Sequence, residues 1–440
     1  MIKKIKILDC TLRDGGYINN WEFSQPQISK IVNALEKSKI DIVELGYLND
    51  KKGNSINSTL FDSVFSVDRA LSSLAPTVQK VVMIDLFSFD IDKLPLQSNT
   101  KINGIRLAFH KKDINDALVA AEKIIDLGYQ LFFQPMVTKN YINDEFRDLI
   151  IRANRLNIHA FYVVDSFGSM TLDEFQHYIS LAHGHLNPSI VLGYHSHNNM
   201  QLAFSNAIDL CISSIDREVI LDSSIYGMGR GAGNLNTELI IDYLNTTSKY
   251  KYEVMPLLGV IDEILAYYFK KNSWGFSPTQ YLSASLDCHP NYASYLVNKK
   301  TTHIVDIRQI LDKIPLEKRN SFNKQIADNL YKEYESYEYD HEMNTGINYE
   351  NALQFDIIDI TMKWCSCETI EECKILIQTD LYEKSISVGD FTKAILKIAT
   401  IVREWMSVFE IIGNIEALHK FNQIENLLLK YITTSQSLYV

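Results

Sequence analysis

Three short stretches of the sequence carry residue types that can act together in catalysis. Arg13 and Asp14 follow an alternating apolar run near the N-terminus, and His195 and His197 stand two residues apart at the end of another apolar run. Residues two apart on a strand point to the same side, so the two imidazoles project together. With a carboxylate they can hold a divalent metal ion and leave positions open for substrate and water. This ligand set indicates a catalytic metal site.

The third stretch is the glycine-rich segment from Gly227 to Asn234, in which four of the first seven residues are glycine. Glycines let backbone N–H groups approach a ligand, and a helix expected to begin near Leu235 would attract an anion to its N-terminus. Gly231 and Gly233 are therefore candidates to bind a substrate carboxylate or phosphate. A tight loop needed to close the fold is an equally weighted interpretation, and one role does not exclude the other.

Eight short apolar runs are expected to position these residues as strands. The runs are the one around Ile5 and Ile7 and residues 41–46, 80–86, 104–109, 130–136, 159–165, 189–194 and 218–223. Segments of helical periodicity separate them, so strand and helix alternate eight times over about 250 residues, which predicts a closed (β/α)8 TIM barrel. The near-continuous apolar character of the runs suits strands that are covered on both faces.

Polar residues gather at the C-terminal ends of these runs, where such barrels place their chemistry. They are Arg13, Asp14, Glu44, Asp85, Arg106, His110, Gln134, Asp165, Ser166, His195, His197, Ser223 and Ser224. A second pair with the same spacing, His183 and His185, precedes its strand. We assign that pair no function, because it is expected at the opposite end of the barrel.

Beyond the eighth unit the pattern becomes helical. We expect a TIM-barrel catalytic domain at residues 1–253, a helical extension packed on the barrel at 254–330, an acidic linker at 331–349 and a helical C-terminal domain at 350–440. The fold class is thus α/β, a barrel followed by an all-helical region. That region is expected to serve oligomer contacts or to cover the barrel.

The formal net charge of −11 argues against nucleic acid as a partner, since phosphate binding needs concentrated Lys and Arg. No apolar stretch reaches membrane-spanning length and no leader pattern is apparent, so we expect a cytoplasmic protein without membrane association. Cys365, Cys367 and Cys373 have no second ligand pair at zinc-site spacing, and we interpret them as reduced helix residues.

Taken together, these motifs resemble a known superfamily. The stretch Thr11-Leu12-Arg13-Asp14-Gly15, the His195-Ser196-His197 motif and the segment 231–234 followed by Thr237 and Glu238 are similar to the metal-dependent lyases and aldolases that include HMG-CoA lyase. The similarity is greatest to the 4-hydroxy-2-oxovalerate aldolases, which residues 106–110, 164–166 and 222–229 also resemble. It covers about residues 5 to 250.

The resemblance implies an aldolase that cleaves or forms a 4-hydroxy-2-oxo acid through a metal-bound pyruvate enolate. It implies that Asp14, His195 and His197 hold a divalent cation, with Mn²⁺ preferred and Mg²⁺, Co²⁺ or Zn²⁺ open, and that Arg13 stabilises the enolate oxygen. The other implied roles are substrate binding by Arg106 and Ser166, and orientation of the metal ligands by Glu44 and Arg106. Asn234 is a metal ligand in some of these proteins and contacts the ligands in others, so both roles are open for it. The implied partners are a small 2-oxo acid, an aldehyde, further copies of this chain and an aldehyde-processing enzyme.

Tyr17 departs from the pattern of these aldolases, which carry a histidine there that transfers a proton at the substrate hydroxyl. A tyrosine with an ordinary pKa near 10 is a poor base at neutral pH, so Tyr17 is expected to donate a hydrogen bond, and His110 or a metal-bound water to act as the base. The difference predicts another aldehyde partner. Two alternatives remain: an acyl-CoA-dependent Claisen synthase or lyase, and a non-catalytic metal- or ligand-binding scaffold.

Overall fold

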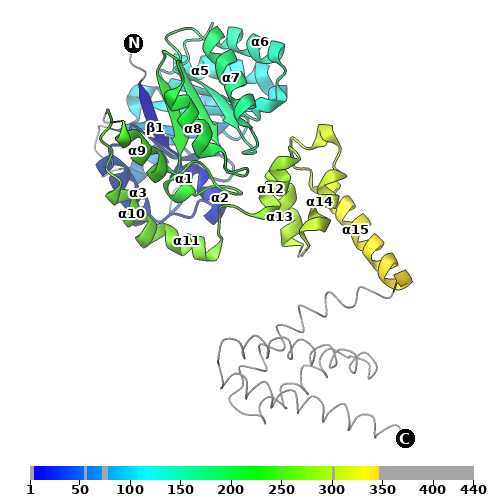
Figure 1. Cartoon of the computed structure of the whole chain (residues 1–440). Helices are drawn as coiled ribbons and strands as arrows, with labels where there is room; N and C mark the ends of the chain where they lie inside the picture. The colour runs from blue at the N-terminus through cyan, green and yellow to red at the C-terminus, as the bar shows by residue number, and fades with distance from the viewer. Residues whose placement is uncertain (1–3, 54–56, 72–77, 248, 300–302, 346–440) are drawn as a thin grey trace, which may run out of the picture. The chain divides into compact units, whose positions relative to one another are not determined.

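The computed structural model describes residues 4–53, 57–71, 78–247, 249–299 and 303–345, with only the backbone described for 335–345. Eight parallel strands close into a ring, because β1 pairs with β9 on one side and with β2 on the other. Figure 1 shows the first and last parts of the barrel side by side. The ring consists of β1 (Ile5–Asp9), β2 (Ile42–Leu48), β4 (Gln79–Asp85), β5 (Gly104–Phe109), β6 (Gln130–Pro135), β7 (Ala160–Asp165), β8 (Val191–Ser196) and β9 (Val219–Ser223). The predicted barrel is confirmed.

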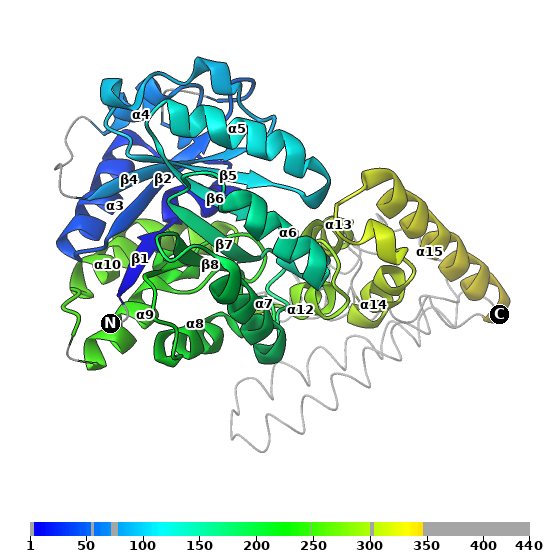
Figure 2. The same ribbon diagram turned by 90° about the horizontal axis from the view of Figure 1, so that it is seen from above.

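Helices surround the ring, as the view from above shows (Figure 2). They bury apolar faces against the strands in one continuous core. The helix after the first strand and its two short turns begins at Gln25, where the Ser24 N–H donates to Gln27 Oε1 at 2.9 Å in a capping box. The helices of the barrel are α1 (Thr11–Asp14), α2 (Gly16–Asn19), α3 (Gln25–Lys37), α4 (Val64–Ala70), α5 (Ile114–Asp126), α6 (Asn143–Ala153), α7 (Leu172–His185), α8 (Ala203–Ile212) and α9 (Thr237–Thr246).

The expected alternation of strand and helix is wrong at one place. Only two 3-10 turns, η1 (Ile91–Lys93) and η2 (Gln97–Asn99), lie between β4 and β5 in the described chain. Pro95 stands between them and cannot donate to a helical backbone bond, so the segment does not continue as an α-helix. A short extra strand, β3 (Leu60–Phe61), pairs with the end of β2 outside the ring.

The interior of the barrel is filled by side chains. A buried apolar cluster there includes Leu8, Phe132, Tyr162 and Ile220. Gly193 lies against the ring of Tyr162, so closely that a Cβ on this glycine would come within 2.4 Å of a ring carbon. The missing side chain therefore lets β8 approach the barrel axis just before it presents its two histidines.

Residues beyond the barrel form helices as far as the structure describes them. They are α10 (Met255–Val260), the π-helical turn η6 (Ile261–Leu265), α11 (Ala266–Lys271), α12 (Pro278–Ser285), α13 (Pro290–Asn298), α14 (Ile304–Asp312), the 3-10 turn η7 (Leu316–Lys318) and α15 (Lys324–Thr345). The segment expected as an acidic linker is thus helical up to Thr345. The chain divides into two compact units, Met1–Tyr331 and Lys332–Val440.

The predicted helical domain at 350–440, the end of the linker at 346–349 and the cysteines at 365, 367 and 373 lie outside the described residues. The domain boundaries stay a prediction. Among the helices that the structure describes, we find none with the length and apolarity needed to cross a bilayer.

Candidate active site

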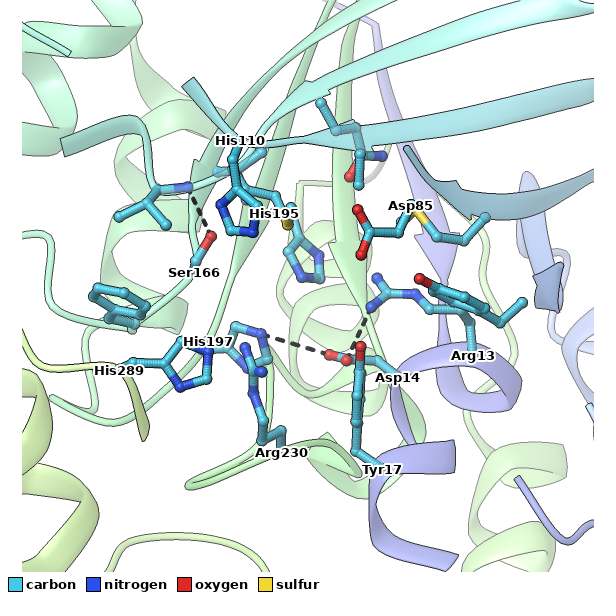
Figure 3. A pocket seen from close by; sticks show the side chains of 18 of the residues that line it. Arg13, Asp14, Tyr17, Asp85, His110, Ser166, His195, His197, Arg230 and His289 are labelled. Atoms are coloured by element: carbon cyan, nitrogen blue, oxygen red, sulfur yellow. Dashed lines mark hydrogen bonds and ion pairs between the residues drawn. The ribbon is translucent and has the colours of Figure 1, made fainter. Parts of the chain in front are cut away.

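A pocket of about 830 Å³, its open mouth included, lies at the C-terminal ends of the barrel strands. Figure 3 shows the side chains that line it. Most of the polar residues predicted from the strand ends meet here. The polar and aromatic residues of the lining are Arg13, Asp14, Tyr17, Tyr47, Asp85, His110, Gln134, Ser166, Phe167, His195, His197, Arg230, His289 and Asn320.

Arg13 and Asp14 stand on the short helix α1, directly after β1. Asp9 Oδ1 accepts the Thr11 N–H at 3.0 Å and fixes the start of this turn. The indole Nε1 of Trp21 donates to the Arg13 carbonyl at 2.8 Å and holds its end. The helical turn directs both charged side chains into the mouth of the barrel, and both are buried there.

Asp14, His195 and His197 converge as predicted, with one possible ligand atom of each within 4.8 Å of the others. Asp14 Oδ2 is buried without a hydrogen-bond partner and lies 3.8 Å from His197 Nε2. Asp222 Oδ2 lies 2.9 Å from His195 Nδ1, so this carboxylate orients the ring and leaves Nε2 to face the centre. A free carboxylate oxygen and two oriented imidazoles fit a divalent cation.

The electrostatics of the three residues agree with a ligand set. Burial opposes the charge of Asp14, but Arg13, His197 and His195 together hold the pKa of this carboxyl below its usual range. Burial lowers the pKa of His197 to about 3, against the attraction of Asp14. An ionised carboxylate and a neutral imidazole are the forms that coordinate metals.

Arg13 is anchored on one side and free on the other. Its Nε donates to Glu44 Oε2 and its Nη1 to Asp14 Oδ1, both at 2.9 Å. Its Nη2 is buried and has no partner among the described residues. The guanidinium therefore carries an uncommitted donor beside the metal-binding atoms, where an oxyanion could accept it.

Arg106 does not line the pocket, so its position suits the orientation of other side chains, the second of its two expected roles. It is fully buried in the barrel interior, where Nη1 donates to Glu44 Oε2 at 2.5 Å and Nη2 donates to Asp222. Its guanidinium lies 5.2 Å from the centroid of the Tyr162 ring. Arg106 thus connects Glu44, which accepts from Arg13, with Asp222, which contacts His195. It positions these groups from below and cannot touch a ligand in the pocket.

Tyr17, His110 and Ser166 all line the pocket, as predicted. Ser166 Oγ accepts the Val137 N–H at 2.9 Å, which leaves its own hydrogen free for a ligand. Burial of the Tyr17 hydroxyl raises its pKa, so the phenol stays protonated at neutral pH. The residue as a whole is 41% exposed, and in Figure 3 the hydroxyl points inward toward Asp14. The protonated phenol can donate a hydrogen bond into the pocket.

Gly231 and Gly233 lie outside the pocket lining, and their role in substrate binding stays a prediction. Both have a left-handed backbone, and a Cβ on Gly233 would come within 2.0 Å of the Gly227 carbonyl oxygen. These glycines form the tight loop that was the alternative interpretation. Asn234 lies behind the site, bridged to His197 by backbone pairing and with Nδ2 donating to the Met228 carbonyl at 3.3 Å.

Several residues of the pocket were not predicted from the sequence, and Arg230 and His289 are two of them. Arg230 is the one charged residue of the glycine-rich loop, for which the sequence predicted only a role of the glycines. His289 comes from the segment between α12 and α13, and its ring lies 5.8 Å from that of Phe167. Burial and the nearby charge of Arg230 lower the pKa of His289 to about 3. No local pattern marks His289, because only the tertiary fold brings it to the barrel.

The pair without an assigned function lies near the end of α7 and does not line the pocket. His183 Nδ1 accepts a hydrogen bond from Arg217 Nε at 3.1 Å, and His185 Nδ1 contacts the Leu181 carbonyl oxygen at 2.9 Å. Two histidines two residues apart thus make contacts near a helix end in α7, whereas the pair with the same spacing at the end of β8 has a metal-binding geometry.

Comparison with known proteins agrees with this geometry. The sequence model of the HMGL-like family matches residues 97–256. The chain contains an HMGL-like domain. It is 24% identical over 276 residues to a 4-hydroxy-2-oxovalerate aldolase of Pelotomaculum thermopropionicum, covering 60% of this chain and 78% of that one. It is 22% identical over 245 residues to an oxaloacetate decarboxylase of Mycobacterium tuberculosis, covering 53% and 68%.

Solved structures show the same architecture around the HMGL-like domain. The N-terminal domain of a candidate aldolase from Bacteroides vulgatus is 26% identical with a TM-score of 0.58, covering 68% of this chain and 99% of that one. The carboxyl transferase domain of Rhizobium etli pyruvate carboxylase, with pyruvate bound, is 11% identical with a TM-score of 0.56, covering 70% and 56%. The second likeness concerns the fold alone. The predicted superfamily is confirmed.

Proposed function

We propose that this chain is a divalent-metal-dependent aldolase of the pyruvate type, which forms or cleaves a 4-hydroxy-2-oxo acid through a pyruvate enolate. The observation that carries the proposal is the convergence of Asp14, His195 and His197 beside the uncommitted Nη2 donor of Arg13. Relatives named 4-hydroxy-2-oxovalerate aldolase support a carbon–carbon lyase.

The residues of the pocket can divide the work as follows. A divalent cation held by Asp14, His195 and His197 would supply Lewis-acid polarisation of the keto group. Arg13 Nη2 donates to the oxygen that becomes negative when the enolate forms, and a fixed donor of this kind lowers the activation barrier by about 3 kcal/mol. Ser166 donates its free hydroxyl hydrogen to the substrate carboxylate.

Proton transfer at the substrate hydroxyl requires a base, and Tyr17 is unsuited because its pKa is raised. His110 also lines the pocket, and we assign the base to it. When the bond between C3 and C4 breaks, the hydroxyl proton passes to the base and the electron pair of that bond becomes the enolate. Tyr17 then stabilises the aldehyde oxygen by donating a hydrogen bond.

The proposal is tested by exchange of the methyl protons of pyruvate in deuterated buffer, followed by NMR. Wild-type protein with Mn²⁺ or Mg²⁺ is expected to exchange them, and Asp14→Asn and His195→Ala are expected to abolish the exchange. His185→Ala, an exposed imidazole outside the pocket, is the matched control and should retain it. Undiminished exchange in both site variants contradicts the site assignment.

A second candidate reaction is decarboxylation of oxaloacetate, which is favoured by the similarity to an oxaloacetate decarboxylase. Loss of carbon dioxide breaks the bond between C3 and C4 and yields the same pyruvate enolate, so the same residues would serve. Carbon dioxide release from oxaloacetate, without product from any aldehyde, would establish this reaction instead.

Two further assays address the alternatives left by the sequence. Release of free CoA from acetyl-CoA in the presence of a 2-oxo acid would support the acyl-CoA reaction. Protein that binds neither a stoichiometric divalent ion nor pyruvate would fit the scaffold interpretation.

A further inference from the structure

The charge of Arg230 has no assigned use in the proposed reaction. This side chain lines the pocket, and in Figure 3 its guanidinium points into it. It lies 5.3 Å from the centroid of the Tyr17 ring, which fixes its orientation by a cation–π contact. Its Nε is buried and has no hydrogen-bond partner among the described residues, and no acidic side chain there forms an ion pair with it.

Neither acidic side chain of the pocket lining, Asp14 or Asp85, forms an ion pair with Arg230. Asp14 is near enough to feel its charge, but that carboxylate already accepts from Arg13 and offers its second oxygen to the metal site. The pocket also contains His110, His289 and the two ligand histidines. A half-buried cation without an ion-pair partner is unfavourable unless an anion binds to it.

Burial divides the pocket into a floor and a rim. The floor consists of Arg13, Asp14, His195 and His197, which are at most 6% exposed. The rim includes Tyr17 and Arg230, which are more exposed. A 2-oxo acid bound at the metal site would occupy the floor, so the rim meets the part of the substrate that arrives with the aldehyde.

We propose that Arg230 binds an anionic group, a carboxylate or a phosphate, at the far end of the acceptor aldehyde, so that the preferred substrate carries two separated negative groups. The inference rests on the proposed function and adds the class of acceptor to it. A guanidinium presents a planar fork of N–H donors that matches both anions. Tyr17 holds this fork from its face, and His289 borders the same side of the pocket.

The first test measures binding of two stable analogues to the Mn²⁺-loaded full chain by calorimetry. The compounds 2-oxoadipate and 2-oxohexanoate have the same carbon number and differ in a terminal carboxylate. Wild-type protein is expected to bind 2-oxoadipate about 10-fold to 100-fold more tightly, the range for a hydrogen bond to a charged group. Arg230→Gln should remove this difference, and Arg230→Lys should restore part of it.

The matched control is Lys37→Gln, which removes one positive charge from an exposed position at the end of α3. Barrel helices run back from the chemical end, so Lys37 lies at the opposite end of the barrel. This variant should keep the full preference for 2-oxoadipate. A wild-type protein that binds both analogues equally, or an Arg230→Gln change that weakens both by the same factor, overturns the inference while the proposed function stands.

The second test distinguishes the two sources of the anion by turnover with pyruvate. Succinate semialdehyde is compared with butanal, and glyceraldehyde 3-phosphate with glyceraldehyde. Arg230→Gln is expected to lower kcat/KM by about 10-fold to 100-fold for one anionic aldehyde, without an equal loss for its neutral partner. The anionic aldehyde that shows this loss identifies the preferred group as a carboxylate or a phosphate. Equal losses within both pairs contradict the inference. Wild-type protein that binds neither analogue and exchanges no pyruvate protons contradicts the proposed function itself.

Discussion

Arg13 connects most of the charged groups at the centre of the pocket. It donates to Glu44 and Asp14 and keeps one donor free, so its position is fixed before any ligand arrives. Donors that are fixed in advance stabilise developing charge without reorganisation at the moment of reaction. The side chain is therefore suited to an enolate oxygen.

The variant Arg13→Lys keeps the charge but loses the planar fork of donors. We expect the rate of pyruvate proton exchange to fall by about 10²-fold to 10³-fold, the effect of removing one donor to a developing oxyanion. Exchange followed by NMR at saturating pyruvate and Mn²⁺ measures it. A rate within a few-fold of wild type would show that Arg13 does not contact the reacting oxygen.

Asp222 orients His195 and also accepts from Arg106. Replacing it by Asn removes the charge from this support, and we expect the affinity for Mn²⁺ to fall by about 10-fold to 100-fold. Titration of free Mn²⁺ by electron paramagnetic resonance checks the change. The control Asp216→Asn alters a similar contact, in which Asp216 lies 3.8 Å from His183 outside the pocket, and should leave the affinity unchanged.

At the scale of elements, each strand delivers its residues only if it approaches the axis correctly. β8 does so because Gly193 leaves room for the Tyr162 ring. The short helix α1, directly after β1, also positions site residues, because it turns Arg13 and Asp14 toward the inside of the barrel mouth. Short elements that lack a full hydrophobic repeat thus decide the geometry of the site.

The substitution Gly193→Ala should destabilise the protein by about 1–3 kcal/mol, because the new methyl group would displace a buried ring. The same change at Gly184, in α7, meets nothing within 4 Å and removes the flexibility of a helical glycine. Gly184→Ala should therefore stabilise by up to about 1 kcal/mol. Urea unfolding of the two variants decides the matter, and changes of the same sign would refute the packing argument.

Much of this arrangement was predictable from the sequence, for identifiable reasons. The two-residue period of a strand placed His195 and His197 on one side, and the alternation of strands and helices placed Asp14 near them. The depth of Arg106 was not predictable, because the sequence does not show how deep a strand residue sits along the barrel axis. Arg230 and His289 depend on a loop conformation and on a contact between distant segments, and neither leaves a periodic pattern.

At the scale of the whole molecule, the barrel buries ionisable groups that its site or its closure requires, and their burial lowers the stability of the fold. Asp9 is one of them: it accepts from Thr11 N at 3.0 Å and from Thr237 Oγ1 at 2.6 Å, and so ties β1 to α1 and α9. Burial nevertheless raises the pKa of its carboxyl to about 6. The folded protein therefore binds this proton more tightly than the unfolded chain does.

This raised pKa predicts a pH dependence of stability. Between about pH 4 and pH 6 the unfolded chain has lost the proton and the folded protein still holds it, so the free energy of unfolding should fall as pH rises, by on the order of 3 kcal/mol from this group. Asp9→Asn can keep both hydrogen bonds after the Thr237 hydroxyl rotates, and should lack this slope. Denaturant unfolding of both proteins across this range compares them, and parallel curves would contradict the assignment.

The predicted association with further copies of the chain and with an aldehyde-processing enzyme stays a prediction. It concerns the helical region beyond the barrel, most of which lies outside the described residues. Size-exclusion chromatography with light scattering measures the oligomeric state directly.

Formation of a carbon–carbon bond is the most direct test of the central claim. Wild-type protein is incubated with Mn²⁺, pyruvate labelled with ¹³C at the methyl carbon and a panel of neutral, anionic and sugar aldehydes. We expect the labelled methyl signal to become a methylene signal of a 4-hydroxy-2-oxo acid, and we expect EDTA or Asp14→Asn to prevent this. If metal-loaded protein joins pyruvate to none of these aldehydes, the aldolase assignment is wrong.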